Sequence, residues 1–259
     1  MKSYIINLAG AVARLERMTT SFGACGIKFE RFDAVTGHAA RSDPAFSLMP
    51  RPKHRRWSDG ELGCLFSHFE IWRRIAAGPE SFAAVFEDDI HLSPLLRGFL
   101  DAPAPPEADI IKLETHSLTS YRSAATEHRA GVGLHRLVDM HYGTAGYVLS
   151  RMAAATLVSR QRYFDVPVDH ILFEPLHRAN AGFKIYQCVP GLVIQDDALP
   201  EAQRWGGALG TAMTERVNTV KARPLLERLS RFPRSGARRI ERLIFPVTVE
   251  MIPFEAVDT

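Results

Sequence analysis

Apolar and polar positions near the start of the chain follow the periods of alternating strands and helices. The apolar segment 4–8 predicts a strand, 14–22 predicts a short helix, and 27–35 predicts a second strand. Strand, helix and strand in this order, with similar spacing later, predict a βαβ unit and a mostly parallel central sheet flanked by helices. The fold class is therefore α/β.

The clearest helix is predicted over 58–77. Ser58 and Glu61 stand at the spacing of a capping box, just ahead of an apolar pattern with a helical period. Glu61, Cys64 and His68 share one edge of this helix, about one and two turns apart, and that edge could face a cleft. A lone histidine on a helix is more often half-buried with one hydrogen-bond partner than catalytic, so both interpretations of His68 stay open.

The chain from 82 to 195 continues this alternation of elements. Strands are predicted over 82–90, 109–113, 183–189 and 192–195, and helices over 94–100, 151–160 and 170–178. The segments 37–56 and 117–133 lack a clear period and are predicted to be loops.

The chain of 259 residues is long enough for one sizeable domain with a tail. We predict a domain over 1–212 and a basic, partly helical tail over 213–259. Between Glu215 and Arg242, nine basic residues stand against three acidic ones, interleaved with apolar residues at helix-like spacing. Such a segment indicates contact with an anionic membrane surface or an acidic partner, although a solvated helix packed on the domain explains it about equally well. Nucleic acid is disfavoured because no binding motif accompanies the charge.

The three cysteines are an odd number without metal-ligand spacing, which argues against a disulfide framework or a zinc ribbon. Their number favours a reducing compartment, and we expect a cytoplasmic location. Lys2 and the apolar residues after it imitate a secretion signal, but Asn7 interrupts them, so the segment is interpreted as the first strand. No stretch reaches the roughly 20 apolar residues of a spanning helix, so the protein is expected to be soluble or peripheral.

The candidate chemistry centres on an acidic cluster at the end of the predicted strand 82–90. Glu87, Asp88 and Asp89 are adjacent, and three neighbouring carboxylates repel one another unless they are well solvated or a cation lies among them. The carboxyl ends of strands are also where open α/β sheets bind ligands. The cluster therefore indicates a divalent metal that holds a phosphate ester. From these three residues alone, an acidic turn in which Asp88 or Asp89 caps the next segment is about equally consistent.

Two charged residues in later elements need an explanation. Lys112 lies inside the apolar strand 109–113, where an isolated ammonium is very unfavourable, so it needs a carboxylate or phosphate partner unless it snorkels to the surface. Asp169 directly precedes the predicted helix 170–178. It is either the N-cap of that helix or a catalytic group.

A group of small and polar residues separates two apolar runs between 135 and 150. It contains His141, Gly143, Thr144 and Gly146. Because small residues let a ligand approach the backbone closely, this group is a candidate binding loop.

Several motifs occur in a fixed order between residue 2 and about residue 197. They are Ile5-Ile6-Asn7-Leu8 with Arg14 and Arg17, Phe32-Asp33-Ala34-Val35, Gly60-Glu61-Leu62-Gly63-Cys64 with Ser67-His68 and Trp72, Phe86-Glu87-Asp88-Asp89, the stretch from Gly143 to Ser150, Pro167-Val168-Asp169, and the stretch from Pro190 to Gln195. Each motif alone is weak, but the ordered set resembles the family 25 glycosyltransferases. This family includes bacterial lipooligosaccharide galactosyltransferases and related domains that glycosylate collagen.

The resemblance implies a glycosyltransferase A-type fold and an inverting transfer of a hexose, usually galactose from UDP-galactose, to a glycan acceptor such as lipopolysaccharide or lipooligosaccharide. It further implies a divalent ion, Mn²⁺ or Mg²⁺, held against the donor diphosphate by Glu87, Asp88 and Asp89, where Glu87 replaces the first aspartate of the usual motif. An acceptor of this kind implies the inner face of the cytoplasmic membrane.

The resemblance also implies roles for other residues. Asp169 matches the acidic position of the Pro-Val-Asp motif and is the leading candidate for the general base, with His68 or His141 behind it. The residues expected to line the donor pocket are Asn7, Arg14, Asp33, Glu61, Lys112, Gly143, Thr144 and Gly146.

Two other functions stay open from the residues themselves. A metal-dependent phosphohydrolase or nucleotidyltransferase would also use clustered carboxylates at a strand end, but no phosphate loop or nucleophile motif accompanies them here. A non-catalytic sugar-nucleotide-binding module is the second alternative, and the intact acidic triplet together with Asp169 argues against it.

Overall fold

The computed structural model describes residues 1–50, 56–116, 119–205 and 247–255, and it confirms the α/β class. The helices are α1 (Val12–Ala24), α2 (Gly37–Ser42), α3 (Pro44–Leu48), α4 (Asp59–Ala77), α5 (Leu96–Asp101), α6 (Arg151–Ser159) and α7 (Val168–Phe173). The strands are β1 (Lys2–Asn7), β2 (Glu30–Asp33), β3 (Phe82–Phe86), β4 (Ile90–Leu92), β5 (Ile110–Lys112), β6 (Glu114–Thr115), β7 (Thr119–Arg129), β8 (Val132–Leu137), β9 (Gly146–Ser150), β10 (Ile185–Val189), β11 (Val193–Gln195) and β12 (Val247–Met251).

Nine strands form the central sheet, in the order β12-β7-β8-β10-β5-β9-β3-β1-β2. The strands β1, β2, β3, β5, β7 and β10 run in one direction, so the predicted mostly parallel sense holds for six of the nine strands. The neighbours that pair in parallel are β1 with β2, β1 with β3, and β5 with β10. The predicted βαβ unit is confirmed, because β1 and β2 are parallel neighbours joined by α1. Strand β9 lies antiparallel between β3 and β5.

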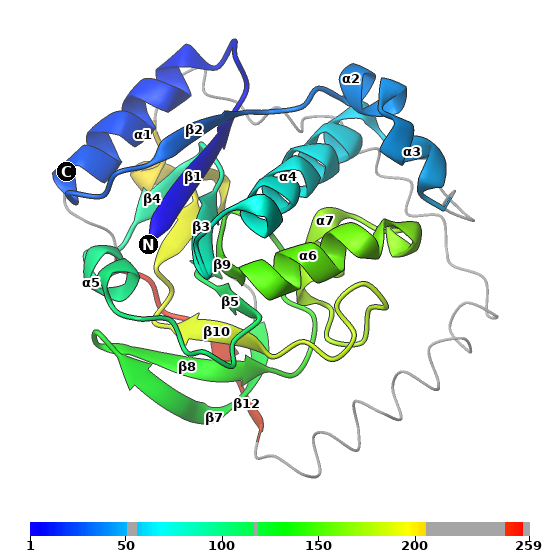
Figure 1. The fold of residues 1–259 in the computed structure, drawn as a ribbon. Helices are drawn as coiled ribbons and strands as arrows, with labels where there is room; N and C mark the ends of the chain where they lie inside the picture. The colour runs from blue at the N-terminus through cyan, green and yellow to red at the C-terminus, as the bar shows by residue number, and fades with distance from the viewer. Residues whose placement is uncertain (51–55, 117–118, 206–246, 256–259) are drawn as a thin grey trace.

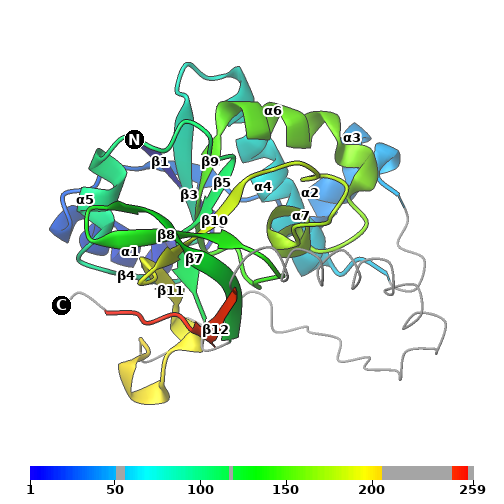
Figure 2. The same ribbon diagram turned by 90° about the horizontal axis from the view of Figure 1, so that it is seen from below.

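Helices cover both faces of this sheet (Figures 1 and 2). The helices α4, α6 and α7 pack on one face, and α1 and α5 pack on the other. Alternate residues of β3 supply the two cores: Ala83 and Val85 belong to the first, and Ala84 and Phe86 to the second. The apolar run at 82–86 is therefore a strand buried on both faces, as its lack of polar alternation predicts.

Helix α4 begins with the predicted capping box. The Ser58 hydroxyl accepts a hydrogen bond from the Glu61 backbone N–H at 3.2 Å, and the Glu61 carboxylate accepts one from the Ser58 backbone N–H at 3.1 Å. These two bonds satisfy donors that the first helical turn leaves free. The Glu61 carboxylate was expected to line the donor pocket, but here it bonds to the backbone at the start of α4.

Three sequence expectations about elements are wrong. The predicted loop 37–56 contains α2 and α3, which begin at caps rather than in a periodic pattern: Thr36 and Asp43 each accept a bond from a helical N–H. The predicted loop 117–133 contains β7, a polar strand held between β8 and β12. The helix expected at 170–178 is α7 (Val168–Phe173), which starts earlier and is shorter.

The end of the predicted tail at 213–259 returns to the sheet, because β12 pairs with the edge of β7. The basic segment from Glu215 to Arg242 lies outside the described residues, so its predicted helical character and the predicted division of the chain at residue 212 stay predictions.

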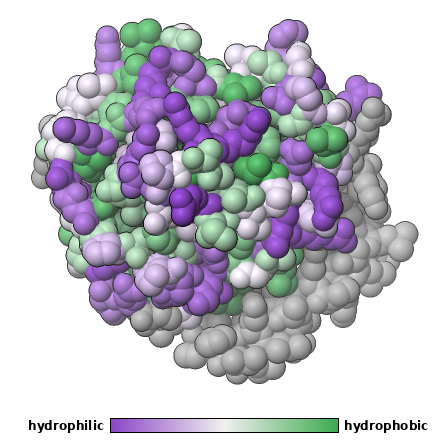
Figure 3. Space-filling model, in the orientation of Figure 1, coloured by the Kyte–Doolittle hydropathy of each residue, from purple (hydrophilic) through white to green (hydrophobic). Residues whose placement is uncertain are grey.

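The face of the molecule shown in Figure 3 has no single large apolar patch, because hydrophilic and hydrophobic residues are intermixed on it. Exposed apolar side chains such as Val12, Leu48 and Met152 lie on three different helices. Within the described ranges, no helix is both long and apolar enough to cross a bilayer.

The capping box gives a direct test of how α4 is held. We expect Ser58→Ala to lower the free energy of unfolding by about 1 kcal/mol, because one N–H of the first turn loses its acceptor. Urea unfolding followed by circular dichroism measures this loss. The exposed Ser47 is a matched control, and Ser47→Ala should change the free energy by less than about 0.5 kcal/mol. Equal effects of the two substitutions would contradict the capping role.

Candidate active site

The chain after β3 separates the three adjacent carboxylates, and Asp88 is directed to the first βαβ unit. Its Oδ2 accepts a hydrogen bond from Asn7 Nδ2 at 2.6 Å, and its Oδ1 accepts one from Arg14 Nη1 at 2.9 Å. All three side chains are buried. Both oxygens of Asp88 are thus engaged with protein groups, and this residue anchors the end of β3 to β1 and α1.

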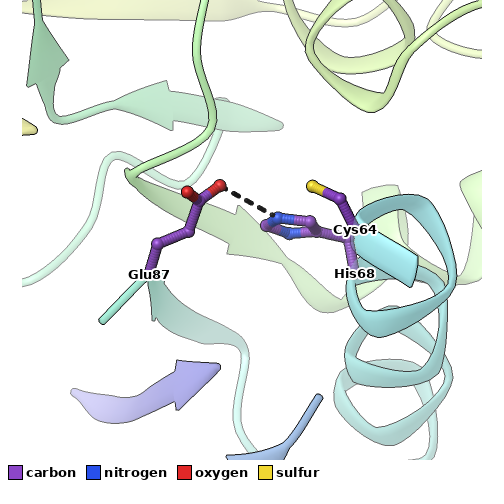
Figure 4. A group of neighbouring side chains, drawn as sticks. All are labelled: Cys64, His68 and Glu87. Atoms are coloured by element: carbon purple, nitrogen blue, oxygen red, sulfur yellow. Dashed lines mark ion pairs between the residues drawn. The ribbon is translucent and has the colours of Figure 1, made fainter. Parts of the chain in front are cut away.

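Glu87 accepts two side-chain hydrogen bonds and lies close to His68. The Thr144 hydroxyl donates to Oε1 at 2.6 Å, and Gln195 Nε2 donates to Oε2 at 3.1 Å. His68 Nε2, on α4, lies 3.5 Å from the same Oε1 (Figure 4). These contacts fix the orientation of the Glu87 carboxylate.

Of the three acids, Asp89 has the most distant hydrogen-bond donors. Its nearest donors, Gln195 Nε2 and Arg14 Nη1, are both 3.5 Å away. Burial and the charge of Glu87 raise the pKa of Asp89 to about 7, although Arg14 opposes the rise. Because one Gln195 amide nitrogen reaches both Glu87 and Asp89, the two carboxylates face a common space that carries excess negative charge.

The hydrogen bonds around His68 indicate which ring nitrogen carries the proton when the imidazole is neutral. Trp72 Nε1, which can only donate, bonds to the Tyr147 hydroxyl at 2.9 Å, and that hydroxyl lies 2.8 Å from His68 Nδ1. Among the described residues, His68 Nδ1 is the acceptor available to the Tyr147 O–H. When the imidazole is neutral, it therefore carries its proton on Nε2, which lies 3.5 Å from Glu87 Oε1 without a hydrogen bond to it.

Two sets of side chains could hold a metal ion. Cys64, His68 and Glu87 place sulfur, nitrogen and oxygen ligand atoms within 4.8 Å of one another (Figure 4). This mixed set fits poorly, because ligation through His68 Nε2 would shift the proton to Nδ1 and leave the Tyr147 O–H without an acceptor. The oxygen pair of Glu87 and Asp89 fits better, because oxygen ligands suit Mg²⁺ or Mn²⁺. A cation would also offset the burial and the charge of Glu87, which together raise the Asp89 pKa.

Asp169 lies in the first turn of α7. Pro167, not Asp169, is the N-cap, so the expected capping role for Asp169 is wrong. One carboxylate oxygen accepts from the backbone N–H of His170 at 2.9 Å, and the other accepts from the backbone N–H of Gly143 at 3.4 Å. Two backbone donors thus orient this carboxylate.

Cys64 shows that Asp169 and the acidic pair converge. Burial first, then the charges of Glu87, Asp169 and Asp89, raise the pKa of the Cys64 thiol well above its usual range. A thiol responds in this way to carboxylates that are close to it. The charges of all three acids therefore reach Cys64, at the edge of α4.

Lys112 has the carboxylate partner that its burial requires. Its Nζ lies 2.9 Å from Glu114 Oε2, and both side chains are fully buried, so the snorkelling alternative is wrong. Burial raises the pKa of Glu114, but Lys112 and His116 outweigh this and hold it at about 2. His141 is also buried, and burial followed by the charge of Lys112 lowers its pKa to about 3, so its ring is neutral.

The remaining predicted pocket residues lie in different places. Asp33 has an exposed side chain, paired with Arg31 at 2.6 Å. The close approaches at two glycines are to protein groups: a Cβ on Gly143 would lie 2.2 Å from His116 Nε2, and one on Gly146 would lie 2.4 Å from Val193 Cγ2. These glycines are required by packing within the protein.

Gln195 and Tyr147 both contribute to the site, although neither had a predicted role of its own. Gln195 is the polar residue that ends β11, a signal of the same kind as the acids that follow β3. Tyr147 gave no signal, because it lies within the apolar strand β9 and its role depends on contacts with α4.

The chain is similar to proteins of one glycosyltransferase family. The model of glycosyltransferase family 25 (LPS biosynthesis protein) matches residues 1–172. The lipooligosaccharide biosynthesis protein lic2B of Haemophilus influenzae is 25% identical over 268 residues, which cover 97% of this chain and 98% of that protein. The lacto-N-neotetraose biosynthesis glycosyltransferase LgtB of Neisseria meningitidis serogroup A is 28% identical over 284 residues, which cover 98% and 100%. A solved glycosyltransferase involved in glycosylation of the major capsid of PBCV-1 aligns with a TM-score of 0.42 and 9% identity, over 78% of this chain and 95% of that one.

The tautomer of His68 can be measured by imidazole ¹⁵N chemical shifts in labelled protein. We expect Nε2 to be protonated and Nδ1 to be the acceptor, since the Tyr147 hydroxyl donates to it. Tyr147→Phe removes this donor and should abolish the preference. A protonated Nδ1 in the unchanged protein would contradict the assignment and would make Nε2 available as a metal ligand.

Asp89 should make the metal-free protein less stable as pH rises. An unfolded aspartate titrates near about 3.9, whereas the folded pKa is raised to about 7. Between these values the unfolded chain releases the proton that the folded chain keeps, so stability falls with pH and becomes level above the folded pKa. Urea unfolding in chelator at about pH 5 and about pH 8 should show that Asp89→Asn removes about 2–3 kcal/mol of this loss. The exposed pair member Asp101 is the control, and Asp101→Asn should keep the wild-type slope.

Proposed function

The chain belongs to glycosyltransferase family 25, and on that premise we propose that it transfers galactose from UDP-galactose to a lipopolysaccharide or lipooligosaccharide acceptor. We further propose that the transfer inverts the configuration of the anomeric carbon. The names of the similar Haemophilus and Neisseria proteins, which refer to lipooligosaccharide and lacto-N-neotetraose biosynthesis, support this acceptor class.

One observation carries the proposal: Gln195 Nε2 reaches both Glu87 and Asp89, and Arg14 only partly offsets the negative charge of these two acids. This is the environment that a diphosphate-bound divalent cation needs, and these two residues would hold Mn²⁺ or Mg²⁺. When bound, such an ion supplies neutralisation of the charge that develops on the departing diphosphate. Asp88 is the weaker candidate for this role, because Asn7 and Arg14 each donate to one of its oxygens.

Arg14 connects the metal pair to the first βαβ unit, which carries the nucleoside in folds of this type. Its guanidinium bonds to Asp88 and reaches Asp89 at 3.5 Å. We assign Arg14 to the donor side, where it adds a fixed positive charge next to the leaving group.

Asp169 is the proposed general base. It takes the proton of the acceptor hydroxyl while that oxygen bonds to the anomeric carbon, and the bond from this carbon to the diphosphate oxygen breaks to release UDP. The backbone N–H groups of Gly143 and His170 orient its carboxylate for this step. The two histidines are weaker candidates, since His68 presents a proton on Nε2 and His141 is buried.

An acceptor carried on a lipid requires access to a membrane surface. We propose that the enzyme acts in the cytoplasm at the inner face of the cytoplasmic membrane, where anionic lipid would attract the basic segment from Glu215 to Arg242. Such attraction is salt-dependent and needs no spanning helix.

The proposal is tested with purified protein, UDP-galactose, Mn²⁺ and a terminal-sugar acceptor, by measuring UDP release. Asp169→Asn should lower kcat by about 100-fold or more and keep donor affinity, because only proton removal is lost. Asp89→Asn should weaken donor binding in Mn²⁺ but not in chelator, measured by calorimetry. These two effects separate the base from the metal pair.

The control for both variants is Asp101→Asn, an exposed aspartate paired with Arg97, which should leave the kinetics unchanged. A thermal-shift screen of UDP-hexoses with and without Mn²⁺ identifies the donor, because a ligand of the folded state raises the midpoint. The proposal fails if the wild-type protein neither binds nor turns over any UDP-hexose.

A further inference from the structure

The short segment Gly143, Thr144 and Ala145, which we call the β9 loop, contacts both acidic centres of the site. The Gly143 N–H donates to Asp169 at 3.4 Å, and the Thr144 hydroxyl donates to Glu87 at 2.6 Å. The Ala145 carbonyl also accepts from the Glu87 backbone N–H at 3.0 Å. One loop therefore spans from the proposed base to the proposed metal pair.

The other side of the β9 loop rests on the buried pair of Lys112 and Glu114. Lys112 Nζ donates to the Gly143 carbonyl, and Glu114 Oε2 accepts from the Ala145 N–H at 3.0 Å. The same pair is joined internally at 2.9 Å. The Gly143 carbonyl and the Ala145 N–H lie just before β9, outside its strand pairing. The two charged side chains satisfy these backbone groups, as a neighbouring strand would do within the sheet.

The local geometry leaves the β9 loop little freedom. Gly143 has φ of +86°, a region that other residues rarely adopt, and a Cβ there would collide with His116 and Glu114. Thr144 and Ala145 are buried, and the Lys112 ammonium lies 4.0 Å from the centre of the Phe173 ring on α7. The pair therefore connects the loop to the helix that carries Asp169.

Stability alone is a weak explanation for this ion pair. Desolvation of two buried charges costs several kcal/mol per ion, and apolar replacements of a whole buried pair are often neutral or stabilising. What an apolar pair could not do is hold the Gly143 carbonyl and the Ala145 N–H at defined points. The charges are thus explained by the position that they impose on the loop.

We propose that Lys112, Glu114 and Thr144 are positioning residues that set the spacing between Glu87 on the donor side and Asp169 on the acceptor side. The inference rests on the proposed function, because it concerns the alignment of an acceptor hydroxyl with the anomeric carbon. Misalignment of reacting groups by about 1 Å can cost about 100-fold in rate.

The central variant replaces the ion pair by neutral groups of similar size, Lys112→Met combined with Glu114→Gln. The glutamine oxygen can still accept from Ala145, whereas the Gly143 carbonyl loses its donor. Thr144→Val is the second variant, which keeps the shape of the side chain but removes the bond to Glu87. Thr144→Ser restores the hydroxyl, and Thr156→Val, on the exposed face of α6, is the matched control.

Each variant is assayed for galactose transfer, for UDP binding by calorimetry and for thermal unfolding. We expect the double variant and Thr144→Val to unfold near the wild-type temperature, to bind UDP within about twofold of wild type, and to transfer about 10- to 100-fold more slowly. Thr144→Ser should recover transfer. Unchanged kcat in both folded variants overturns the proposal, as does a fall in Thr144→Val that Thr144→Ser does not rescue. If the double variant does not fold, Thr144→Val and Thr144→Ser decide alone.

Hydrogen exchange separates this inference from the proposed function. The amides of Gly143 and Ala145 should exchange slowly in the wild type and faster in the double variant, while α6 is unchanged. If the wild type transfers no sugar from any UDP-hexose, the proposed function fails, and the exchange pattern still decides whether the pair holds the loop. Equal exchange in wild type and double variant rejects the holding role whatever the activity is.

Discussion

Repulsion among three adjacent carboxylates is the constraint on which the site depends. The chain meets it by giving each acid different partners: β1 and α1 for Asp88, and the β9 loop and β11 for Glu87. Asp89 has only two contacts, both at 3.5 Å, and burial followed by the charge of Glu87 raises its pKa. The compensation is thus greater for Asp88 than for Asp89, which is one of the two proposed metal ligands.

The antiparallel strand β9 explains how one loop reaches so many groups. An antiparallel strand begins at the edge of the sheet where its two parallel neighbours end. Here Gly146 pairs with Phe86 at the end of β3, and Tyr147 pairs with Lys112 at the end of β5. The residues just before β9 therefore lie between Glu87 and Glu114. If β9 were parallel to β3 and β5, it would end at this edge of the sheet instead of beginning there. The loop that enters β9 would then not lie beside Glu87 and Glu114.

Short-range patterns in the sequence were enough to predict the features that depend on residues close together in the chain. The capping box at Ser58, the two-faced burial of β3 and the first βαβ unit all follow from short-range patterns. The partners of Asp88 are 74 and 81 residues away, and no period reports such a contact. The polar strand β7 was missed for the same reason, because its strand character comes from pairing with β8 and β12 rather than from its own apolar alternation.

The site extends beyond the part of the chain that the family model matches, which ends at residue 172. Gln195, the amide between Glu87 and Asp89, comes from β11, and β11 is held in place by β4 and β6. Strand β10 lies in the middle of the large sheet, between β5 and β8, so β7 and β8 reach the rest of the sheet through it. The segment after residue 172 therefore completes both the sheet and the acidic pair. The arrangement of Glu87 and Asp89 is consequently a property of the whole fold rather than of the acidic motif, because the motif supplies the charges and β11 supplies the amide that contacts both acids.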